Sequence, residues 1–462
     1  MLKGENKKTV LFVVPDGTGI RNYLFSDIIP KLHKAGKNIY IYHSLDDKAL
    51  DEVRKIHKIK FESKNISHYR ETIKQKFLRE VIAFSRLKYN ANLVNNDTIL
   101  TNWNRNRKGT KKYFYKLVEG IGNYYSKKYS RILWLEEKYQ KSLLISINKE
   151  IKFLKDLTVE SLFCTHQRAI NAIPIIKAAN VLKIKTIGAI YSWDNIPKGR
   201  LSVRTQKYLV WSNYMKNELL QFYPEINLES IVITGTPQFE FYNDESIFLN
   251  REIFFKNQNL DLNKITICFS GDDELTSPYD PNYLEDLADE ILKNNKENDV
   301  QIIFRRSPVD LSGRYDKVIN KYKAFIVPIR PLWSNNREHW STLFPSFNDV
   351  KLLANICKHS DLVINLGSTM AHDFAIFNKP AAYLNYNSVI DKRWSVETIY
   401  KFQHFRSMPN QNQLYWINSK EEILKIINLA INHKKSLGKE WLRVINCDNK
   451  NSSLNIVNQI LN

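Results

Sequence analysis

A glycine and two hydroxyl residues, Gly367, Ser368 and Thr369, stand where a buried apolar strand is expected to run into a helix. At such a helix start, unpaired backbone N–H groups, the two hydroxyls and the positive end of the helix dipole converge, which suits a phosphate group. Asp373 lies four residues after Thr369 and so on the same helix face, where its carboxylate can accept hydrogen bonds from sugar hydroxyls. Phosphate and ribose together indicate a nucleotide. The alternative is an ordinary N-cap with Asp373 as a surface acid.

Three residues at the ends of predicted strands carry side chains that can take a proton. Asp16 follows the first apolar run, His166 ends the run "FCTH", and Asp194 lies in "SWDN". A hydroxyl that acts as a nucleophile needs such a base. Each residue also has a structural alternative: Asp16 as a turn residue, His166 as a capped loop histidine and Asp194 as the cap of the next turn. We rank Asp16 and His166 together, ahead of Asp194.

Two series of alternating strands and helices must position these residues. The first series has apolar runs at 9–14, 38–44, 161–166, 185–191, 207–212 and 231–237. The second has them at 264–273, 300–308, 324–329, 361–366 and 381–386. Strands that alternate with helices imply parallel sheets covered by helices. The predicted fold class is therefore α/β with two tandem, doubly wound, Rossmann-like domains, and a ligand-binding cleft is expected between them at the C-terminal ends of the strands.

The predicted boundaries follow from this pattern. We expect a first domain over 1–240, a second over 241–435 and a C-terminal helical segment over 436–462, with the polar and aromatic run 238–263 as the link. Residues from about 66 to 151 are predicted to be a helical, basic insertion in the first domain. Two domains also fit a chain of 462 residues, which exceeds the size of one hydrophobic core.

The composition favours an intracellular protein. The four cysteines lie far apart without CxxC spacing, which disfavours a zinc site or a disulfide framework and suits a reducing cytoplasm. Residues 1–14 hold only a short apolar run and lack the cleavage site of a signal peptide. No apolar run approaches the roughly 20 residues needed to cross a bilayer. We therefore expect a cytoplasmic protein, and no metal or cofactor is implied.

The formal net charge is +21, and residues 70–141 contain 17 Lys and Arg against 6 Asp and Glu. Aromatic residues are interleaved with this charge: Trp103, Tyr113, Phe114, Tyr115, Tyr124, Tyr125, Tyr129 and Trp134. Such a surface suits anionic lipid headgroups and equally a nucleic-acid backbone, and the alternative is a solvated helical face. Because no nucleic-acid-binding motif occurs, we expect an anionic membrane surface as partner rather than nucleic acid.

Residues 361–386, with "DLVIN", "GST" and "MAHDFAIFNKPAAYLNY", resemble the donor-binding domain of GT-B glycosyltransferases. Within that clan they resemble CDP-glycerol polyol-phosphate transferases and bacterial surface-polysaccharide transferases. In those families a Ser/Ser or Ser/Thr pair opens the helix that holds the donor phosphates, and an acidic residue further along it often takes the ribose. Residues 191–242, with Trp-Asp-Asn and Gly-Thr-Pro-Gln, resemble the end of the acceptor domain. The similarity covers both domains and is weakest over the basic segment.

The resemblance implies transfer of a sugar from a nucleotide-activated donor to a hydroxyl of a glycan or lipid-linked acceptor, as in surface-polysaccharide biosynthesis. The catalytic base would be one of Asp16, His166 and Asp194, and the protein would act as a peripheral enzyme on the inner face of the cytoplasmic membrane. The implied donor-binding residues are Gly271, Arg305, Arg306, Gly367, Ser368, Thr369 and Asp373. Gly235 and Thr236 are expected to lie between the domains.

One departure from the family concerns the middle of the donor domain. Many members carry His-Pro where this chain has Ser307 and Pro308 after two arginines. A guanidinium of Arg305 or Arg306 would bind a donor phosphate as a bidentate fork in place of the imidazole. Strand alternation allows only one of the two to face the ligand, and an ion pair is the alternative for the other.

Three other functions stay open on the sequence. They are a polyol-phosphate transferase that uses CDP-glycerol or CDP-ribitol, a non-hydrolysing nucleotide-sugar epimerase, and a basic RNA- or membrane-binding protein without catalysis. The sequence also leaves open whether the nucleotide is UDP, GDP, CDP or CMP.

Overall fold

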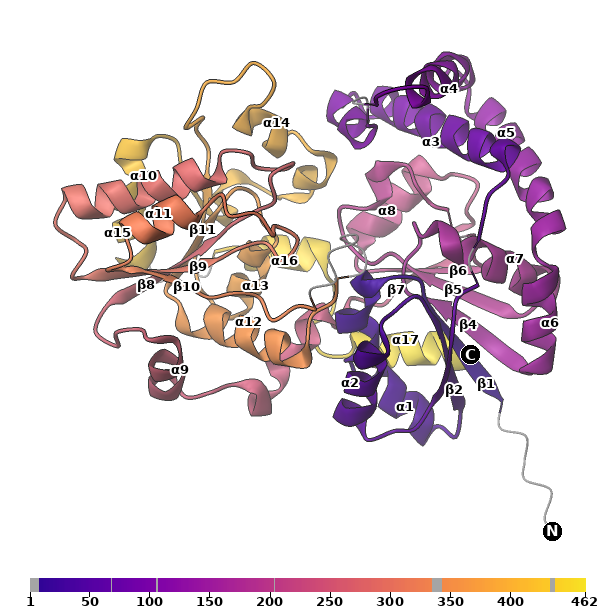
Figure 1. Ribbon diagram of the computed structural model, residues 1–462, viewed down its shortest axis with the longest axis horizontal. Coiled ribbons are helices and arrows are strands. Elements are labelled where there is room, and N and C mark those ends of the chain that lie inside the picture. The colour runs from indigo at the N-terminus through magenta and orange to yellow at the C-terminus, as the bar shows by residue number, and fades with distance from the viewer. Residues whose placement is uncertain (1–7, 68, 105–106, 203, 335–342, 433–436) are drawn as a thin grey trace, which may run out of the picture. The chain divides into compact units, whose positions relative to one another are not determined.

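The computed structural model of the protein describes residues 8–67, 69–104, 107–202, 204–334, 343–432 and 437–462. The chain divides into two compact units. The first unit comprises residues 1–238, 402–404 and 445–462, and the second comprises 239–401 and 405–444. Residues 445–462, which belong to the C-terminal segment predicted from the sequence, therefore group with the first unit (Figure 1).

In the described part of the first unit, seven parallel strands form one sheet in the order β3-β2-β1-β4-β5-β6-β7. The strands are β1 (Thr9–Val14), β2 (Asn38–His43), β3 (Glu62–Asn65), β4 (Val159–Cys164), β5 (Lys185–Ala189), β6 (Lys207–Val210) and β7 (Ile231–Ile233). Every residue of β1 is buried, as expected for a central strand covered on both faces.

Helices cover both faces of this sheet. They are α1 (Ile28–Lys34), α2 (Asp47–His57), α6 (Asn148–Asp156), α7 (Ile173–Val181), α8 (Asn213–Phe222) and α17 (Ser452–Leu461). Apolar side chains of α6 and α7 join those of β1, β2 and β4 in one buried core that includes Leu11, Leu154, Leu162 and Ile176. The C-terminal helix α17 packs on β4 and α1 and so completes the first unit.

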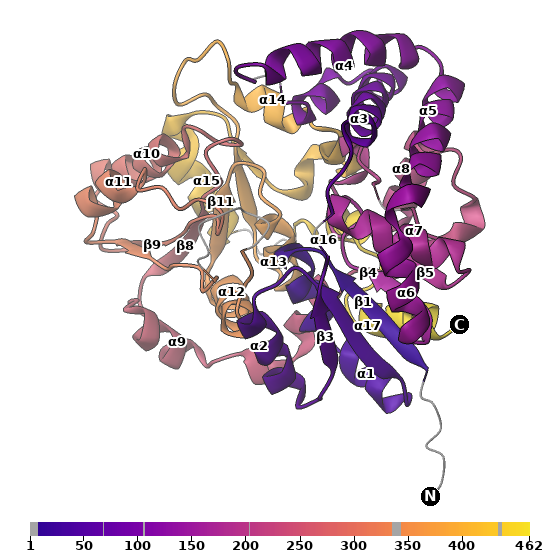
Figure 2. The same cartoon turned by 45° about the vertical axis from the view of Figure 1, so that its right-hand side comes forward.

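The basic insertion is helical, as the sequence predicts. The helices α3 (Ile73–Leu93), α4 (Lys111–Tyr125) and α5 (Tyr129–Ser142) pack on one another (Figure 2). A capping box fixes the start of α3: Thr72 Oγ1 accepts from the Gln75 N–H, and Gln75 Oε1 accepts from the Thr72 N–H. Trp103, expected among the surface aromatics, is instead buried, because its indole packs on Phe84.

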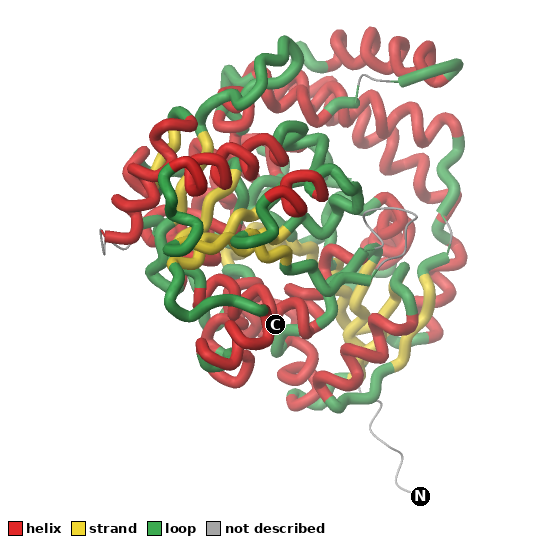
Figure 3. The backbone as a smooth tube through the Cα atoms, turned by 60° about the vertical axis from the view of Figure 1, so that its left-hand side comes forward, coloured by secondary structure: helices red, strands yellow, loops and turns green. Residues whose placement is uncertain are grey.

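Over its described residues, the second unit contains a six-stranded parallel sheet in the order β10-β9-β8-β11-β12-β13. The strands are β8 (Ile265–Ser270), β9 (Val300–Arg305), β10 (Ile326–Pro328), β11 (Leu362–Asn365), β12 (Ala381–Leu384) and β13 (Tyr415–Ile417). The helices are α9 (Arg251–Gln258), α10 (Asp280–Lys293), α11 (Asp316–Lys321), α12 (Phe347–His359), α13 (Met370–Ile376), α14 (Val396–Tyr400), α15 (Ile423–Asn432) and α16 (Lys439–Ile445). Helices enclose the strands of each unit (Figure 3).

Three details differ from the sequence-based prediction. The expected link 238–263 contains the 3₁₀ turns Pro237–Asn243 and Glu245–Ile247 and the helix α9, because Asn250 caps α9 by accepting from two N–H groups of its first turn. The edge strand β3 was missed because its sequence, ESKN, has no apolar run. The short edge strand β13 was missed as well, since its residues 415–417 are too few to give a pattern.

Candidate functional site

The strand order of the first sheet reverses between β1 and β4, because β1 to β3 run to one side and β4 to β7 to the other. Asp16 lies in the loop after β1, and His166 lies in the loop after β4. The two strands are paired up to Val13 and Cys164, so both loops leave the same edge of the sheet next to each other. Such a reversal point is where open parallel sheets bind their ligands.

Asp16 and His166 form a hydrogen-bonded pair at this point. Asp16 Oδ2 lies 2.5 Å from His166 Nδ1, and Asp16 Oδ1 accepts from the Thr18 N–H at 3.1 Å and the Thr18 hydroxyl at 2.5 Å. Burial on its own raises the pKa of Asp16, but the hydrogen bonds and charge of His166 and the hydrogen bonds of Thr18 outweigh it and lower the pKa below its ordinary value. Asp16 is therefore a carboxylate that accepts the Nδ1–H of His166.

The pairing leaves the other ring nitrogen of His166 as an acceptor. His166 is buried, its ring packs edge-on against Tyr191 at 4.5 Å between centroids, and Nε2 has no hydrogen-bond partner among the described residues. A histidine whose Nδ1–H is held by a carboxylate presents an Nε2 lone pair of fixed direction. This arrangement can deprotonate a hydroxyl brought to Nε2.

Asp194, the third candidate base, is held in its own turn. It forms an ion pair with Lys198, four residues on, and accepts hydrogen bonds from the Ser192 hydroxyl at 2.6 Å and the Asn195 amide at 2.8 Å. Burial on its own raises the pKa of Asp194, but Lys198 and His404 outweigh it and lower the pKa far below the ordinary value. So acidic a carboxyl group is a poor base near neutral pH.

The second sheet reverses its strand order between β8 and β11. Gly271 follows β8, residues 367–369 follow β11, and Arg305 ends β9, the neighbour of β8. Four of the predicted donor-binding residues therefore follow the two strands that flank the reversal point of this unit, and the arginine pair lies one strand away. The Gly271 N–H donates to the Arg305 carbonyl at 2.9 Å, which joins the two strand ends.

The loop 367–369 keeps its two hydroxyls accessible. Gly367 has φ +74°, a conformation that residues with a side chain rarely adopt, and it turns the chain out of β11. Asn365 Oδ1 accepts from the Ser368 N–H at 2.8 Å, and Ser368 Oγ accepts from the Met370 N–H at 3.3 Å. Thr369 is exposed, and its side chain makes no capping bond to α13.

Asp373 lies inside the second unit rather than at its surface. It is 3% exposed, and its carboxylate accepts a hydrogen bond from the Tyr242 hydroxyl at 2.7 Å. The sequence predicts that Asp373 shares a helix face with Thr369. In the structure, the Asp373 carboxylate lies in the interior of the unit. The alternative of a surface acid is wrong for the same reason.

The two arginines after β9 have different surroundings. Arg305 is buried, and its Nη2 lies 2.9 Å from both carboxylate oxygens of Asp349. Asp349 also accepts from the Leu332 N–H and the Trp333 indole, each at 2.8 Å. The Arg306 side chain is 21% exposed, and the carboxylate nearest to it, of Asp316, is 3.9 Å away. Of the two, Arg306 has the guanidinium that is free to meet an anion.

Asp272, next to Gly271, is a carboxyl group that the sequence did not single out. Burial, together with the charges of Asp280 and Asp273, raises the pKa of Asp272 well above its ordinary value. A raised pKa favours the uncharged form, and an uncharged carboxyl group does not repel a bound phosphate. The sequence does show two consecutive acids, Asp272 and Asp273, after a buried strand. The acid with the larger effect on the pKa of Asp272 is Asp280, which lies eight residues further along the chain.

Gly235 and Thr236, expected between the domains, hold the C-terminal segment on the first unit. Gly235 has φ +73°, and an added Cβ would lie 2.4 Å from the Ser452 hydroxyl and 2.8 Å from the Asp448 carbonyl. The Thr236 N–H donates to Asn446 Oδ1 at 2.9 Å. The first unit ends two residues later, at Gln238.

Among the described residues, no group of three or more His, Cys, Asp and Glu side chains is placed to hold a metal ion. The described helices include none that is both long and apolar enough to cross a membrane.

No family model matches this chain, and no curated protein matches it. Solved structures do match. The UDP-GlcNAc 2-epimerase of Neisseria meningitidis bound to UDP-GlcNAc has a TM-score of 0.50 at 12% identity over 98% of this chain and 99% of that chain. The MnaA–UDP structure from S. aureus has a TM-score of 0.52 at 12% identity over 98% and 96%. A glycosyltransferase from Rickettsia africae has a TM-score of 0.51 at 13% identity over 99% of each chain.

At these identities the likeness concerns the fold alone. It agrees with the two parallel sheets and confirms the prediction of two Rossmann-like domains of the GT-B type.

Proposed function

We propose that the protein is a nucleotide-sugar-dependent glycosyltransferase in which His166 deprotonates the acceptor hydroxyl. The observation that carries this proposal is the Asp16–His166 pair at the reversal point of the first sheet, with Nε2 of His166 left as an acceptor. Asp16 fixes the tautomer and the direction of the ring. Since a hydroxyl is a weak nucleophile until its proton is removed, a positioned base accelerates transfer by roughly 10²–10⁴-fold.

The donor in this proposal lies at the second unit's reversal point. The hydroxyls of Ser368 and Thr369 and the guanidinium of Arg306 would hold the phosphates. Asp373 would position the loop from inside, through Tyr242, rather than bind ribose. The donor is a substrate, and no metal is required, since cationic and N–H groups can stabilise the leaving phosphate.

A nucleotide screen followed by a transfer assay tests the proposal. Unfolding temperatures are measured with UDP, GDP, CDP and CMP, because a ligand at 100 times its Kd stabilises by about 2.7 kcal/mol. Sugar nucleotides of the base that binds are then incubated with and without lipid-phosphate acceptors. We expect nucleotide release that depends on the acceptor and that His166→Ala abolishes. Release of CMP from CDP-glycerol or CDP-ribitol would instead identify a polyol-phosphate transferase.

A second candidate is a nucleotide-sugar 2-epimerase, which the likeness to the Neisseria and S. aureus structures supports at the level of the fold. An epimerase needs no acceptor. Conversion of UDP-GlcNAc to its 2-epimer by the protein alone, followed by NMR, would identify it and would contradict the transferase proposal.

We also propose peripheral binding to an anionic membrane through α4. Tyr113, Leu117 and Tyr124 are 74%, 57% and 54% exposed and share one face of the helix. Exposed lysines lie on both sides of these apolar residues in the sequence: Lys111, Lys112, Lys127 and Lys128. Each cation near an anionic bilayer contributes about 1 kcal/mol to the free energy of membrane binding. The charge reversal replaces Lys111, Lys112, Lys127 and Lys128 by Glu. The matched control reverses the exposed Lys48, Lys149, Lys152 and Lys155.

We expect the protein to sediment with anionic vesicles at low salt and not with neutral ones, and salt to release it. The α4 reversal should abolish sedimentation and spare nucleotide binding, whereas the control should sediment like the wild type. Equal loss in both variants would show a non-specific charge effect and contradict a role for α4.

A further inference from the structure

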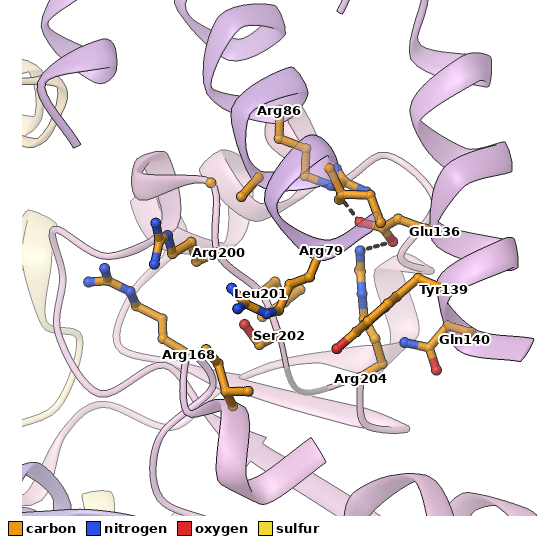
Figure 4. Close-up of a pocket in the computed structure, with 14 residues that line it drawn as sticks. Arg79, Arg86, Glu136, Tyr139, Gln140, Arg168, Arg200, Leu201, Ser202 and Arg204 are labelled. Carbon is orange, nitrogen blue, oxygen red and sulfur yellow. Dashed lines mark hydrogen bonds and ion pairs between the residues drawn. The ribbon is translucent and has the colours of Figure 1, made fainter. Parts of the chain in front are cut away.

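A cavity lies wholly within the first unit, beneath the basic insertion (Figure 4). It contains about 550 Å³ of empty space, part of it open to solvent. The helices α3 and α5, the loop after β4 and the loop before β6 enclose it. Its walls carry five arginines: Arg79, Arg86, Arg168, Arg200 and Arg204.

Two of these arginines are neutralised by a buried network. Arg86 binds Glu136 at 2.7 Å and Glu225 at 2.8 Å, and its side chain is 1% exposed. Arg204 pairs with the same two carboxylates. Figure 4 shows Glu136 between the two guanidinium groups. This network ties α3 and α5 to the sheet domain and leaves neither cation available to a ligand.

Arg79 is neutralised as well. Its guanidinium binds both carboxylate oxygens of Glu71, at 2.7 and 2.8 Å, and Glu80 at 2.8 Å. The three paired arginines therefore use four carboxylates.

Arg168 and Arg200 have no such compensation. Among the described residues, neither guanidinium forms an ion pair with a carboxylate, and Arg168 donates to the side-chain oxygen of Asn195 at 3.3 Å. Their guanidinium groups extend in the same direction at one side of the cavity (Figure 4). Burial lowers the pKa of Arg200 below its ordinary value; Glu80 opposes this, while the charges of Arg168 and Arg79 add to it.

Two partly buried like charges destabilise the fold unless an anion joins them. Both arginines line this one cavity, and each guanidinium carries a fork of N–H donors that phosphate oxygens accept. The lining also includes the apolar residues Ile82, Ala83, Ile170 and Leu201, which suit the organic part of a phosphate ester rather than a free ion.

We propose that this arginine pocket binds a phosphate or diphosphate group of the acceptor substrate, with Arg168 and Arg200 as its ligands. The identification of the ligand as the acceptor rests on the glycosyltransferase proposal; the anion site itself does not. Arg168 is two residues from His166 in the same loop, so an acceptor held by its phosphate would enter the region of the proposed base. The pocket would also distinguish phosphorylated acceptors from neutral glycans.

Calorimetric titration with inorganic pyrophosphate at low ionic strength tests the site. The test variant is Arg168→Gln with Arg200→Gln, and Lys149→Gln with Lys152→Gln is the matched control, since both remove two positive charges. Because the test variant loses charge-assisted hydrogen bonds to the anion, it should bind pyrophosphate at least about tenfold more weakly. The control should stay within about twofold. Equal pyrophosphate affinity in the test variant and the wild type would overturn the proposal.

Thermal unfolding distinguishes a binding role from a structural one. Without anions, the test variant should unfold at the wild-type temperature or above it, because the substitutions remove repulsion. Pyrophosphate should raise the unfolding temperature of the wild type and of Arg168→Lys with Arg200→Lys, but not that of the test variant. A clear loss of stability in the test variant without anions would mean that the arginines are structural, and it would overturn the proposal.

Two further measurements separate the ligands. UDP or another nucleotide should bind the test variant as it binds the wild type; a parallel loss would make the pocket a donor site and overturn the acceptor assignment. His166→Ala should retain pyrophosphate binding. If the wild type binds pyrophosphate through this pair but transfers no sugar to any phosphorylated acceptor, the anion site stands and the glycosyltransferase proposal fails.

Discussion

The two reversal points have the same topology and opposite chemistry. In the first unit, the carboxylate Asp16 is ionised and holds a histidine whose buried Nε2 has no hydrogen-bond partner among the described residues. In the second unit, Arg305 is paired with Asp349, and burial together with the charges of Asp280 and Asp273 raises the pKa of Asp272 well above its ordinary value. What stays accessible there is a loop of hydroxyls and N–H groups. In the proposed function, the first unit performs proton transfer and the second holds the donor.

The largest expected effect is on kcat, and it tests whether proton transfer belongs to the first unit. His166→Ala should lower kcat by roughly 10²–10⁴-fold and leave nucleotide affinity near the wild-type value, because the base acts only in the transition state. Asp16→Asn should also lower kcat strongly, since the tautomer of His166 is no longer fixed. Asp194→Asn is the matched control at a neighbouring strand end and should keep most activity. Steady-state kinetics and calorimetry measure both quantities; wild-type kcat in His166→Ala would move proton transfer away from the first unit.

The next effect is on stability, and it compares two adjacent arginines of the second unit. Arg305→Gln leaves the buried Asp349 without its cation, and breaking a buried pair from one side costs about 3–5 kcal/mol. Arg306→Gln removes only a 3.9 Å contact with the exposed Asp316 and should change the free energy of unfolding by less than about 0.5 kcal/mol. Urea unfolding measures both. Arg306→Gln should instead weaken nucleotide binding. If Arg306→Gln destabilises the fold and Arg305→Gln weakens nucleotide binding, the roles of the two residues are exchanged.

The central strands of both units could be predicted from the sequence because they are continuous apolar runs, such as Thr9–Val14. The Asp16–His166 contact could not, since it joins residues 150 apart and depends on the pairing of β1 with β4. The same holds for Arg305, whose partner Asp349 is 44 residues away. The ion pair of Asp194 with Lys198 was within reach of the sequence, because the two residues are one helical turn apart.

A smaller effect concerns the hydroxyls of the second reversal point. Ser368→Ala with Thr369→Ala should weaken nucleotide binding roughly tenfold, because each hydroxyl contributes about 1 kcal/mol and more when it meets a charged phosphate. The fold should be retained, since Thr369 makes no capping bond and the bond from the Met370 N–H to Ser368 is long. Ser395→Ala, at the cap of α14, is a control of the same type. Unchanged affinity in a folded double variant would remove the donor site from this loop.

The smallest expected effect is on the pH dependence of stability. Asp16, which follows β1, and Asp272, which follows β8, should change the free energy of unfolding with pH in opposite directions. The pKa of Asp16 is lowered in the folded protein, so its contribution to stability is present above its unfolded pKa of about 3.9 and is lost as the pH falls through the folded value. The pKa of Asp272 is raised, so the folded protein retains that proton more tightly, and stability falls as the pH rises from about 4 towards the folded value.

Asp16→Asn should therefore be less stable than the wild type at neutral pH, and the difference should shrink in acid. Asp272→Asn should be equal to the wild type in acid and more stable at neutral pH. Asp156→Asn, at an exposed acid, is the control and should follow the wild type throughout. Thermal unfolding between pH 2 and pH 8 measures the three curves, and the shifts should amount to a few degrees at most. Parallel curves for Asp16→Asn and Asp272→Asn would mean that the two reversal points hold their acids in the same charge state, which would remove the electrostatic basis for assigning proton transfer to one unit and ligand binding to the other.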